Sequence, residues 1–265
     1  MSTDLDKRIL LTGSSSYIGR SYINSFNQNS NQQIISTYRK NRPTTNKKNV
    51  YFRKFDLFSN ENKNVYQKFG KPDTLIHLAW DFLPDYDHIN HIKKNYFYSY
   101  KFIFELIKSG CKNINIIGTH QEAGDMEGKI PENFINFVGK NNYAIGKQML
   151  YYSVNELKKK YNFNFKWIRI FNLYGRGNNR GLFNQLHNKT IKNINLTDGR
   201  QKIDFIHIDE CVNKIKVISK SKKSGVYNLG SGKAIKLKQF IESYKINNKI
   251  NKVTNYGKIK YEGPN

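Results

Sequence analysis

The chain has 265 residues, a formal net charge of +25, 38% hydrophobic and 14% aromatic residues, and two cysteines. This length and hydrophobic content suffice for one large α/β domain with a small appendage, and no apolar run approaches the roughly 20 residues that a membrane span needs. No signal sequence is recognisable ahead of the first apolar segment, so we expect a cytoplasmic protein that is not inserted in a membrane.

Neither the charge nor the cysteines indicate a special partner. Lysines are spread along the whole chain, and the densest runs, Lys158–Lys160 and Lys220–Lys223, fall where helices should end, which suits the helix dipole. This distribution argues against specific nucleic-acid binding. Cys111 and Cys211 are too far apart for a metal knuckle and too few for a disulfide framework, so we expect no metal site.

In chain order, apolar segments typical of buried strands alternate with stretches of helical periodicity. This order predicts an α/β fold of the Rossmann type, with a doubly wound parallel sheet that binds its ligands at the carboxyl ends of the strands. The strands are expected at 8–12, 33–38, 50–55, 74–79, 113–118 and 165–170, and the clearest helices at 18–27, 93–109 and 142–158.

The first strand leads into TGSSSYIGR (12–20), which is typical of a turn that binds a dinucleotide. A tight turn needs Gly13, Gly19 lets the helix pack close to the sheet, and a pyrophosphate can meet amide groups at the helix N-terminus. Ser16 stands where a third glycine is usual, so the segment alone fits a plain strand-turn-helix equally well. The predicted cofactor contacts here are Gly13, Ser15, Ser16, Tyr17, Ile18 and Gly19.

After the second strand, an NAD site would usually present an Asp or Glu to the ribose hydroxyls. This chain has Arg39, Lys40 and Arg42 instead, which favours the 2′-phosphate of NADP(H) over NAD. A solvated basic loop is the alternative.

Further along, Tyr143 and Lys147 lie four residues apart, on one face of the predicted helix after strand five. An ammonium near a phenol is expected to lower the pKa of the tyrosine, which makes the pair a proton donor and acceptor for carbonyl and alcohol chemistry. Thr119, at the end of strand five, could bind the same oxygen. Tyr256 and Lys260 have the same spacing but do not follow strand five.

Nine segments in order together resemble the extended short-chain dehydrogenase/reductases that act as nucleotide-sugar epimerases, dehydratases and reductases. They are TGSSSYIGR, FDLF (55–58), IHLAW (76–80), Asn95, GTHQEAG (118–124), YAIGK (143–147), RIFNLYGRG (169–177), DFIHIDE (204–210) and YNLGSG (227–232).

The resemblance implies roles for individual residues. Thr119, Tyr143 and Lys147 take the catalytic positions, whereas His77 and His207 are expected to be structural. Further cofactor contacts would be Asp56, Leu57, Leu78, Ala79 and Trp80, besides Tyr143 and Lys147, and substrate contacts would be Trp80, Thr119, His120, Asn172 and Arg200.

Residues that differ from the family pattern narrow the range of reactions that we expect. Dehydratases carry Asp-Glu after the catalytic threonine, whereas His120 and Gln121 follow Thr119, so the acid and base for eliminating water are missing. Ile203 stands where the family usually has a phosphate-binding arginine, so that contact is missing unless Arg200 or Lys202 supplies it. By the same resemblance the C-terminus comes early for the family, so we expect less of a substrate lid.

We therefore expect a dinucleotide-binding domain of residues 1–170 plus about 203–223, and a small C-terminal substrate domain of 171–202 and 224–265. The leading interpretation is NADPH-dependent reduction of a nucleotide-linked 4-keto-6-deoxy sugar, for surface-polysaccharide biosynthesis, by a homodimer. An NAD-dependent nucleotide-sugar 4-epimerase is the near alternative. The alternative from another class is a non-catalytic NADP-sensing or RNA-associated relative, which would need neither Tyr143 nor Lys147.

Overall fold

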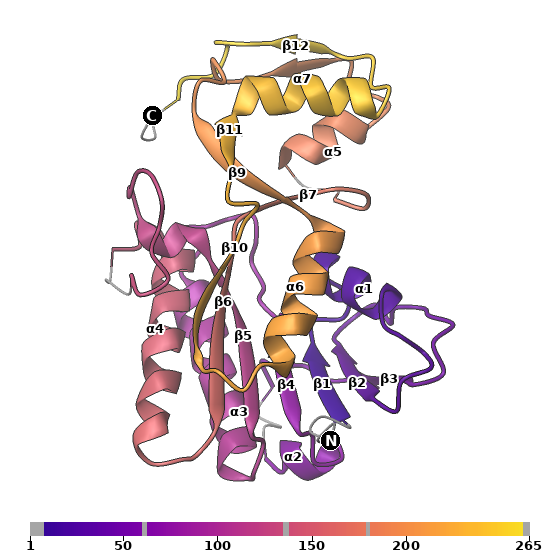
Figure 1. Cartoon of the computed structure of the whole chain (residues 1–265), viewed down its shortest axis with the longest axis vertical. Helices are drawn as coiled ribbons and strands as arrows, with labels where there is room; N and C mark the ends of the chain where they lie inside the picture. Colours follow the sequence, from indigo (N-terminus) through magenta and orange to yellow (C-terminus); the bar gives the residue numbers. More distant parts are fainter. Residues whose placement is uncertain (1–7, 60–62, 135–137, 179–180, 262–265) are drawn as a thin grey trace.

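The computed structural model describes residues 8–59, 63–134, 138–178 and 181–261, and its main feature is a seven-stranded parallel sheet (Figure 1). The strand order is β10-β6-β5-β4-β1-β2-β3. This arrangement confirms the predicted doubly wound α/β fold. The strands are β1 (Arg8–Thr12), β2 (Gln33–Tyr38), β3 (Val50–Lys54), β4 (Thr74–His77), β5 (Asn113–Thr119), β6 (Asn164–Ile170) and β10 (Gly225–Leu229).

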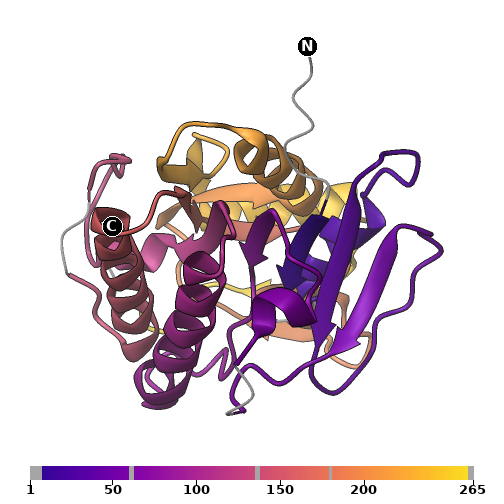
Figure 2. The same cartoon turned by 90° about the horizontal axis from the view of Figure 1, so that it is seen from below.

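Helices cover both faces of this sheet, as Figure 2 shows from below. One face carries α1 (Tyr17–Asn24) and α6 (Ile208–Lys220), and the other carries α2 (Val65–Lys68), α3 (Phe97–Lys108) and α4 (Asn142–Glu156). Each face has its own apolar core, with Ile23 and Val212 in one and Phe102 and Leu150 in the other, all at most 1% exposed. Burial on both faces explains why the central strands read as continuous apolar segments.

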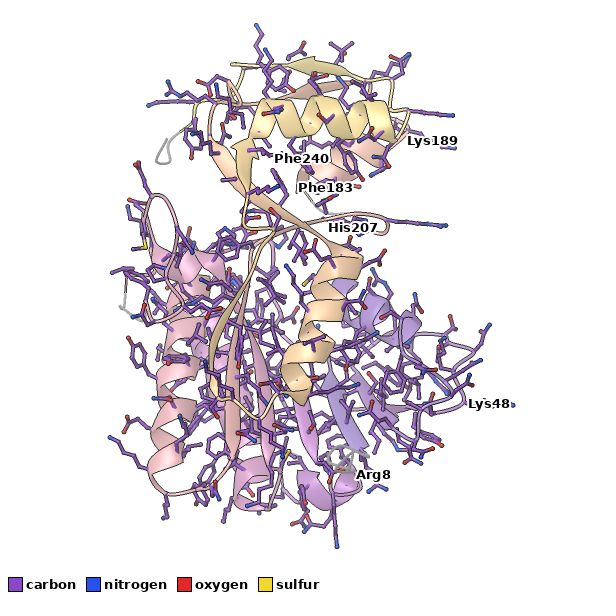
Figure 3. The ribbon with its side chains drawn as sticks, in the orientation of Figure 1. Arg8, Lys48, Phe183, Lys189, His207 and Phe240 are labelled. Atoms are coloured by element: carbon purple, nitrogen blue, oxygen red, sulfur yellow. The ribbon has the colours of Figure 1, made fainter. Side chains whose placement is uncertain are left out.

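A small domain lies over the carboxyl ends of the large sheet (Figure 1). It contains short strands, two helices and a third apolar core. In Figure 3, Phe183 and Phe240 lie between the two helices, and their ring centroids are 6.2 Å apart. The elements are β7 (Asn172–Tyr174), α5 (Gly181–His187), β8 (Asn193–Asn195), β9 (Lys202–His207), β11 (Ala234–Lys236), α7 (Leu237–Asn247) and β12 (Val253–Asn255).

The domain boundaries differ from the expected ones in two strands. β10 pairs with β6 in the large sheet, so residues 225–229 do not belong to the small domain. The reason is that α6 carries the chain back along the sheet, and a helical crossover returns a strand parallel to its neighbours. β9, expected in the larger domain, instead pairs with β7 and β11.

Two helices also begin or end differently from the prediction. The first begins at Tyr17, because Ser16 caps its N-terminus, and it ends at Asn24. The predicted helix 93–109 is a π-helical turn, His91–Tyr96, followed by α3. Within the described ranges, no helix is both long and apolar enough to cross a membrane.

Candidate functional site

The turn after β1 has the tight geometry that a phosphate-binding loop requires. Gly13 has φ +75°, and a Cβ there would lie 2.9 Å from the backbone nitrogen of Ala79. A Cβ on Gly19 would lie 2.3 Å from the carbonyl oxygen of Gly13. Ser16 fits in place of the third glycine because its Oγ accepts a hydrogen bond of 3.0 Å from the Gly19 backbone nitrogen. A serine N-cap is a common helix-start signal, so this role was readable from the sequence.

This turn opens into a cleft of about 210 Å³ at the carboxyl ends of β1, β2 and β4. It brings together many of the predicted cofactor contacts, and its backbone turn and hydroxyl groups fit the phosphates and ribose of a dinucleotide. Its walls are Thr12, Gly13, Ser15, Ser16, Thr37, Tyr38, Arg39, Phe55, Asp56, Leu57, Phe58, Leu78, Ala79, Trp80 and Asp81. Seven predicted contacts do not line it: Tyr17, Ile18, Gly19, Lys40, Arg42, Tyr143 and Lys147.

Of the three basic residues expected at the ribose, only Arg39 reaches the cleft. Its Nη1 is 2.7 Å from Asp81 Oδ2, and its guanidinium lies 5.7 Å from the Phe58 ring centroid. Burial raises the pKa of Asp81, but the hydrogen bond and charge of Arg39 outweigh it, so the net pKa is lowered. The Arg39 charge is therefore already partly neutralised. Lys40 and Arg42 are exposed.

His77 supports the floor of the cleft from below. Thr12 Oγ1 accepts bonds of 3.2 Å from the backbone nitrogens of Leu78 and Ala79, so its own proton goes to His77 Nδ1 at 2.9 Å. The opposite nitrogen, Nε2, then donates to Ser99 Oγ at 3.1 Å. Burial lowers the pKa of His77 to about 3, so this imidazole is neutral and shapes the cleft without exchanging protons.

The residues Thr119, Tyr143 and Lys147, which we call the triplet, come together beside the cleft. Thr119 is the last residue of β5, and its side chain is hydrogen-bonded to that of Tyr143. Asn141 caps α4 by accepting 2.9 Å from the Ala144 nitrogen, which puts Tyr143 in the first turn. Lys147, 2% exposed, donates to the Ile117 carbonyl at 2.7 Å.

The electrostatics of the triplet differ from the prediction. We expected Lys147 to lower the pKa of Tyr143, and this was wrong: burial raises it, and the hydrogen bond from Thr119 only partly opposes the rise. Burial also lowers the pKa of Lys147 to about 7, against the opposing charge of Glu122. A lysine whose pKa is lowered this far, with its Nζ 6.0 Å from the Tyr143 ring centroid, is a weak source of positive potential for the phenol.

An aromatic wall surrounds Tyr143 and Lys147. The Trp80 ring centroid lies 3.8 Å from Lys147 Nζ and 6.0 Å from the Tyr143 ring. Its Nε1 donates to His91 Nδ1 at 3.0 Å, and His91 Nε2 donates to the Asp85 carbonyl at 2.7 Å. His91 therefore fixes the Trp80 ring over the lysine.

The segment that builds this wall has unusual backbone geometry. His91 starts the π-helical turn, Phe82 has φ +67°, and Tyr86 packs 5.6 Å from the Tyr143 ring. Such π-helical turns and left-handed residues occur often at functional sites. Sequence reasoning missed His91 and Tyr86, since the segment 81–91 has no recognisable periodicity.

The predicted substrate contacts divide into two groups. His120 stacks on Phe171 at 5.5 Å, and Asn172 donates to the Asp204 carbonyl at 3.3 Å, so both lie where the chain passes from the large sheet to the small domain. Arg200 instead binds Asp198 at 3.1 Å in an exposed turn.

Neither proposed replacement for the missing phosphate-binding arginine reaches the triplet. Ile203, in its place, packs against the small-domain core. Lys202 is exposed, and no contact of the described residues joins Lys202 or Arg200 to the triplet.

His207 lies at the junction between β9 and α6 (Figure 3). Its Nδ1 accepts from the Asp209 nitrogen at 3.3 Å, which caps α6, and its ring is 5.1 Å from that of Tyr174.

One buried carboxylate near the triplet escaped the sequence analysis. Glu122, 3% exposed, accepts 2.8 Å from the Thr119 backbone nitrogen in a capping box over the 3-10 turn His120–Ala123. A threonine followed three residues later by a glutamate is the sequence signature of this cap, so the signal was present. No group of three or more His, Cys, Asp or Glu side chains that could hold a metal occurs in the described ranges.

Comparison with known proteins places the sequence among nucleotide-sugar enzymes, in agreement with a dinucleotide cleft. Residues 9–230 match the NAD dependent epimerase/dehydratase family. A dTDP-6-deoxy-L-talose 4-dehydrogenase (NAD(+)) from Aggregatibacter actinomycetemcomitans is 25% identical over 244 residues, covering 89% of this chain and 88% of that protein.

Solved structures extend the likeness to the fold. A UDP-N-acetylglucosamine 4-epimerase from Methanobrevibacter ruminantium M1, in complex with UDP-N-acetylmuramic acid, superposes with a TM-score of 0.82 at 19% identity, covering 98% of this chain and 89% of that one. MoeE5, in complex with UDP-glucose and NAD, gives 0.80 at 18% identity, covering 94% and 85%. At these identities the likeness shows the fold alone.

Proposed function

The chain belongs to the NAD dependent epimerase/dehydratase family, enzymes that act on nucleotide sugars, and on that premise we propose that it reduces a nucleotide-linked 4-keto-6-deoxy sugar with NADPH. The observation that carries the proposal is the triplet beside the dinucleotide cleft, with Thr119 hydrogen-bonded to Tyr143 and Lys147 one helical turn further along α4.

In this proposal each side chain has a distinct task. A nicotinamide cofactor, when bound, supplies the hydride. Tyr143 gives a proton to the oxygen of the reduced carbonyl, and a raised pKa keeps its phenol protonated and available as an acid. Thr119 hydrogen-bonds the same oxygen and orients it. Lys147, with a pKa lowered to about 7, can pass a proton on near neutral pH.

The reaction at C4 has independent support from the relative. A 4-dehydrogenase of a nucleotide-linked 6-deoxyhexose oxidises the C4 alcohol, and the reverse of that reaction is reduction of a 4-keto-6-deoxy sugar. Elimination of water is disfavoured because His120 and Gln121 offer no carboxylate. The carboxylate of the next residue, Glu122, is buried against Trp167 and Arg169.

The cofactor choice leaves room for a second candidate function. Arg39 lines the cleft and supports a preference for NADP(H), with Lys40 and Arg42 adding positive potential outside it. Pairing of Arg39 with Asp81 weakens that argument and favours NAD, as does the name of the relative. An NAD-dependent 4-epimerase, which uses the same triplet, is therefore the second candidate.

The test is a mixture of enzyme, NADPH and a nucleotide-linked 4-keto-6-deoxyhexose. We expect NADPH consumption in proportion to the ketone lost, and no consumption with Tyr143→Phe. The contrasting reaction is a nucleotide-linked hexose with no added cofactor. Conversion of that hexose to its 4-epimer would replace the proposal by the epimerase.

We also propose that the protein is a homodimer that pairs through α3 and α4. Phe97 is 48% exposed and Tyr152 is 37% exposed, although both are large and apolar. The two helices share one apolar core, and the Tyr96 hydroxyl, in the π-helical turn just before Phe97, is 3.0 Å from the hydroxyl of Ser153, next to Tyr152, so the exposed rings can form one continuous surface. Light scattering should give twice the 31.1 kDa chain mass, falling to one chain mass when both rings are replaced by Ser.

A further inference from the structure

Glu122 is tied into a buried network that joins the ends of β5 and β6. Its Oε1 accepts from the Thr119 backbone nitrogen at 2.8 Å, and its Oε2 accepts from Trp167 Nε1 at 2.9 Å and Arg169 Nε at 3.0 Å. The ion pair between Glu122 and Arg169 is almost fully buried, with side chains 3% and 4% exposed. In addition, Gln148 on α4 donates to the Glu122 carbonyl at 2.9 Å.

The surrounding backbone makes room for this network. A Cβ on Gly118 would lie 2.3 Å from Trp167 Nε1 and 2.6 Å from Glu122 Oε1, so only glycine fits beside the carboxylate. Arg169 is held from its other end by a hydrogen bond to the Phe134 carbonyl. Buried ion pairs are seldom worth their desolvation for stability alone, which points to a role in arranging the groups around them.

We propose that Glu122 is a positioning residue for the reaction: its carboxylate fixes the end of β5 so that the Thr119 hydroxyl meets Tyr143, and its negative charge favours the ammonium form of Lys147. The inference rests on the proposed function, since it concerns the same triplet. It does not make Glu122 an acid or a base, because all its contacts are internal.

The geometry explains both effects. Thr119 follows Gly118, where no side chain anchors the strand, so the bond from Glu122 restrains the backbone that carries the hydroxyl. Around Lys147, the titratable neighbours His77 and His91 are neutral at pH 7, and Tyr143 is uncharged. Burial raises the pKa of Glu122 itself, but the charge of Arg169 and the hydrogen bonds to the carboxylate oppose that rise, and the charge that Glu122 carries opposes the loss of the Lys147 proton.

The experiment compares Glu122→Gln with a matched control, Glu242→Gln. Glu242, in the small domain, also accepts three side-chain hydrogen bonds, from Tyr256, Thr254 and Lys245, and lies outside the triplet. Because Glu122→Gln leaves the Arg169 guanidinium unpaired and can fail to fold, Glu122→Met with Arg169→Met is the second variant, which removes both charges together.

Two readouts are taken on each folded variant. The first is kcat and KM with the nucleotide-linked 4-keto sugar: we expect kcat to fall by about 10- to 100-fold with KM within about twofold, as for a misplaced catalytic group. The second is the pKa of Lys147, followed by NMR of ¹³C-lysine-labelled enzyme and assigned with Lys147→Met. It should fall in Glu122→Gln and stay at the wild-type value in Glu242→Gln.

The two readouts separate the two proposals. If the wild-type enzyme turns over no nucleotide-linked 4-keto sugar, the proposed function fails, and the Lys147 titration alone decides the role of Glu122. An unchanged Lys147 pKa then overturns the inference. With an active wild type, a folded Glu122 variant whose kcat stays within twofold of wild type also overturns it.

Discussion

Replacing Lys147 by Met should stabilise the fold while it destroys the proposed activity. Burial lowers the pKa of this lysine from 10.5 to about 7, a difference that corresponds to roughly 5 kcal/mol at 1.36 kcal/mol per pKa unit. The pKa difference already includes the favourable contacts of the ammonium, so two of these contacts enter only as interactions that Met gives up. The Trp80 ring at 3.8 Å contributes about 1–2 kcal/mol, and the bond to the Ile117 carbonyl about 1–2 kcal/mol more.

Because Met is apolar and of similar length, Lys147→Met should gain about 1–3 kcal/mol of unfolding free energy at pH 6. The sign follows from proton binding. Below pH 7 both the folded and the unfolded wild type hold the proton, and the penalty is complete. Between pH 7 and 10.5 the unfolded chain keeps the proton that the folded one has lost, so wild-type stability rises by about 1.4 kcal/mol per pH unit.

Urea unfolding at pH 6, 7 and 9 measures this effect. The advantage of Lys147→Met over wild type should shrink by about 2–3 kcal/mol between pH 7 and pH 9. Lys108→Met, at an exposed position at the end of α3, is the control and should show no such trend. Parallel stability curves for wild type and Lys147→Met over this pH range, or a less stable variant at pH 6, would refute the reasoning.

Three further predictions concern the cleft and the triplet. Tyr143→Phe keeps the packing and removes the proton donor, so turnover should fall by about 10²- to 10⁴-fold while cofactor affinity by fluorescence titration changes little; full activity would exclude Tyr143 as the acid. Gly13→Ala should lose at least about tenfold in cofactor affinity, because its Cβ would contact the Ala79 backbone. Gly128→Ala is the control, since Gly128 has φ +78° but nothing within 4 Å of its Cβ, and it should keep its affinity. Equal losses in both variants would contradict the close-approach argument. Arg39→Ala should weaken NADP(H) by about tenfold and leave NAD(H) unchanged, and equal effects on both cofactors would mean that Arg39 reads no 2′-phosphate.

The parts of the molecule that the sequence predicted well are those that local pattern determines. The six predicted strands were located to within two residues. The central ones are covered on both faces and are therefore mostly apolar, whereas β3 ends in the exposed Arg53 and Lys54. The meeting of Thr119 with Tyr143 was predictable for a related reason. The carboxyl ends of parallel strands share one edge, and the helix after β5 must start there.

Strand partners were harder to assign than strands. The sequence of β10 (Gly225–Leu229) is compatible with a strand in either domain. Its pairing with β6 is what places it in the large sheet. That choice depends on where α6 delivers the chain, which is a property of the whole crossover and not of the five residues of the strand.

The charge state of the triplet could not be predicted at all, because it depends on burial from segments distant in sequence. Spacing places an ammonium four residues from a phenol and suggests attraction, whereas in the fold Trp80 covers Lys147 and both groups lose solvation. Desolvation moves the lysine towards its neutral form and the phenol towards its protonated form. Both shifts favour the state in which Tyr143 holds its proton and Lys147 is uncharged. In the proposed reaction, an enzyme that donates a proton to the reduced carbonyl benefits from that state, and the Trp80 ring over Lys147 contributes to the burial that favours it.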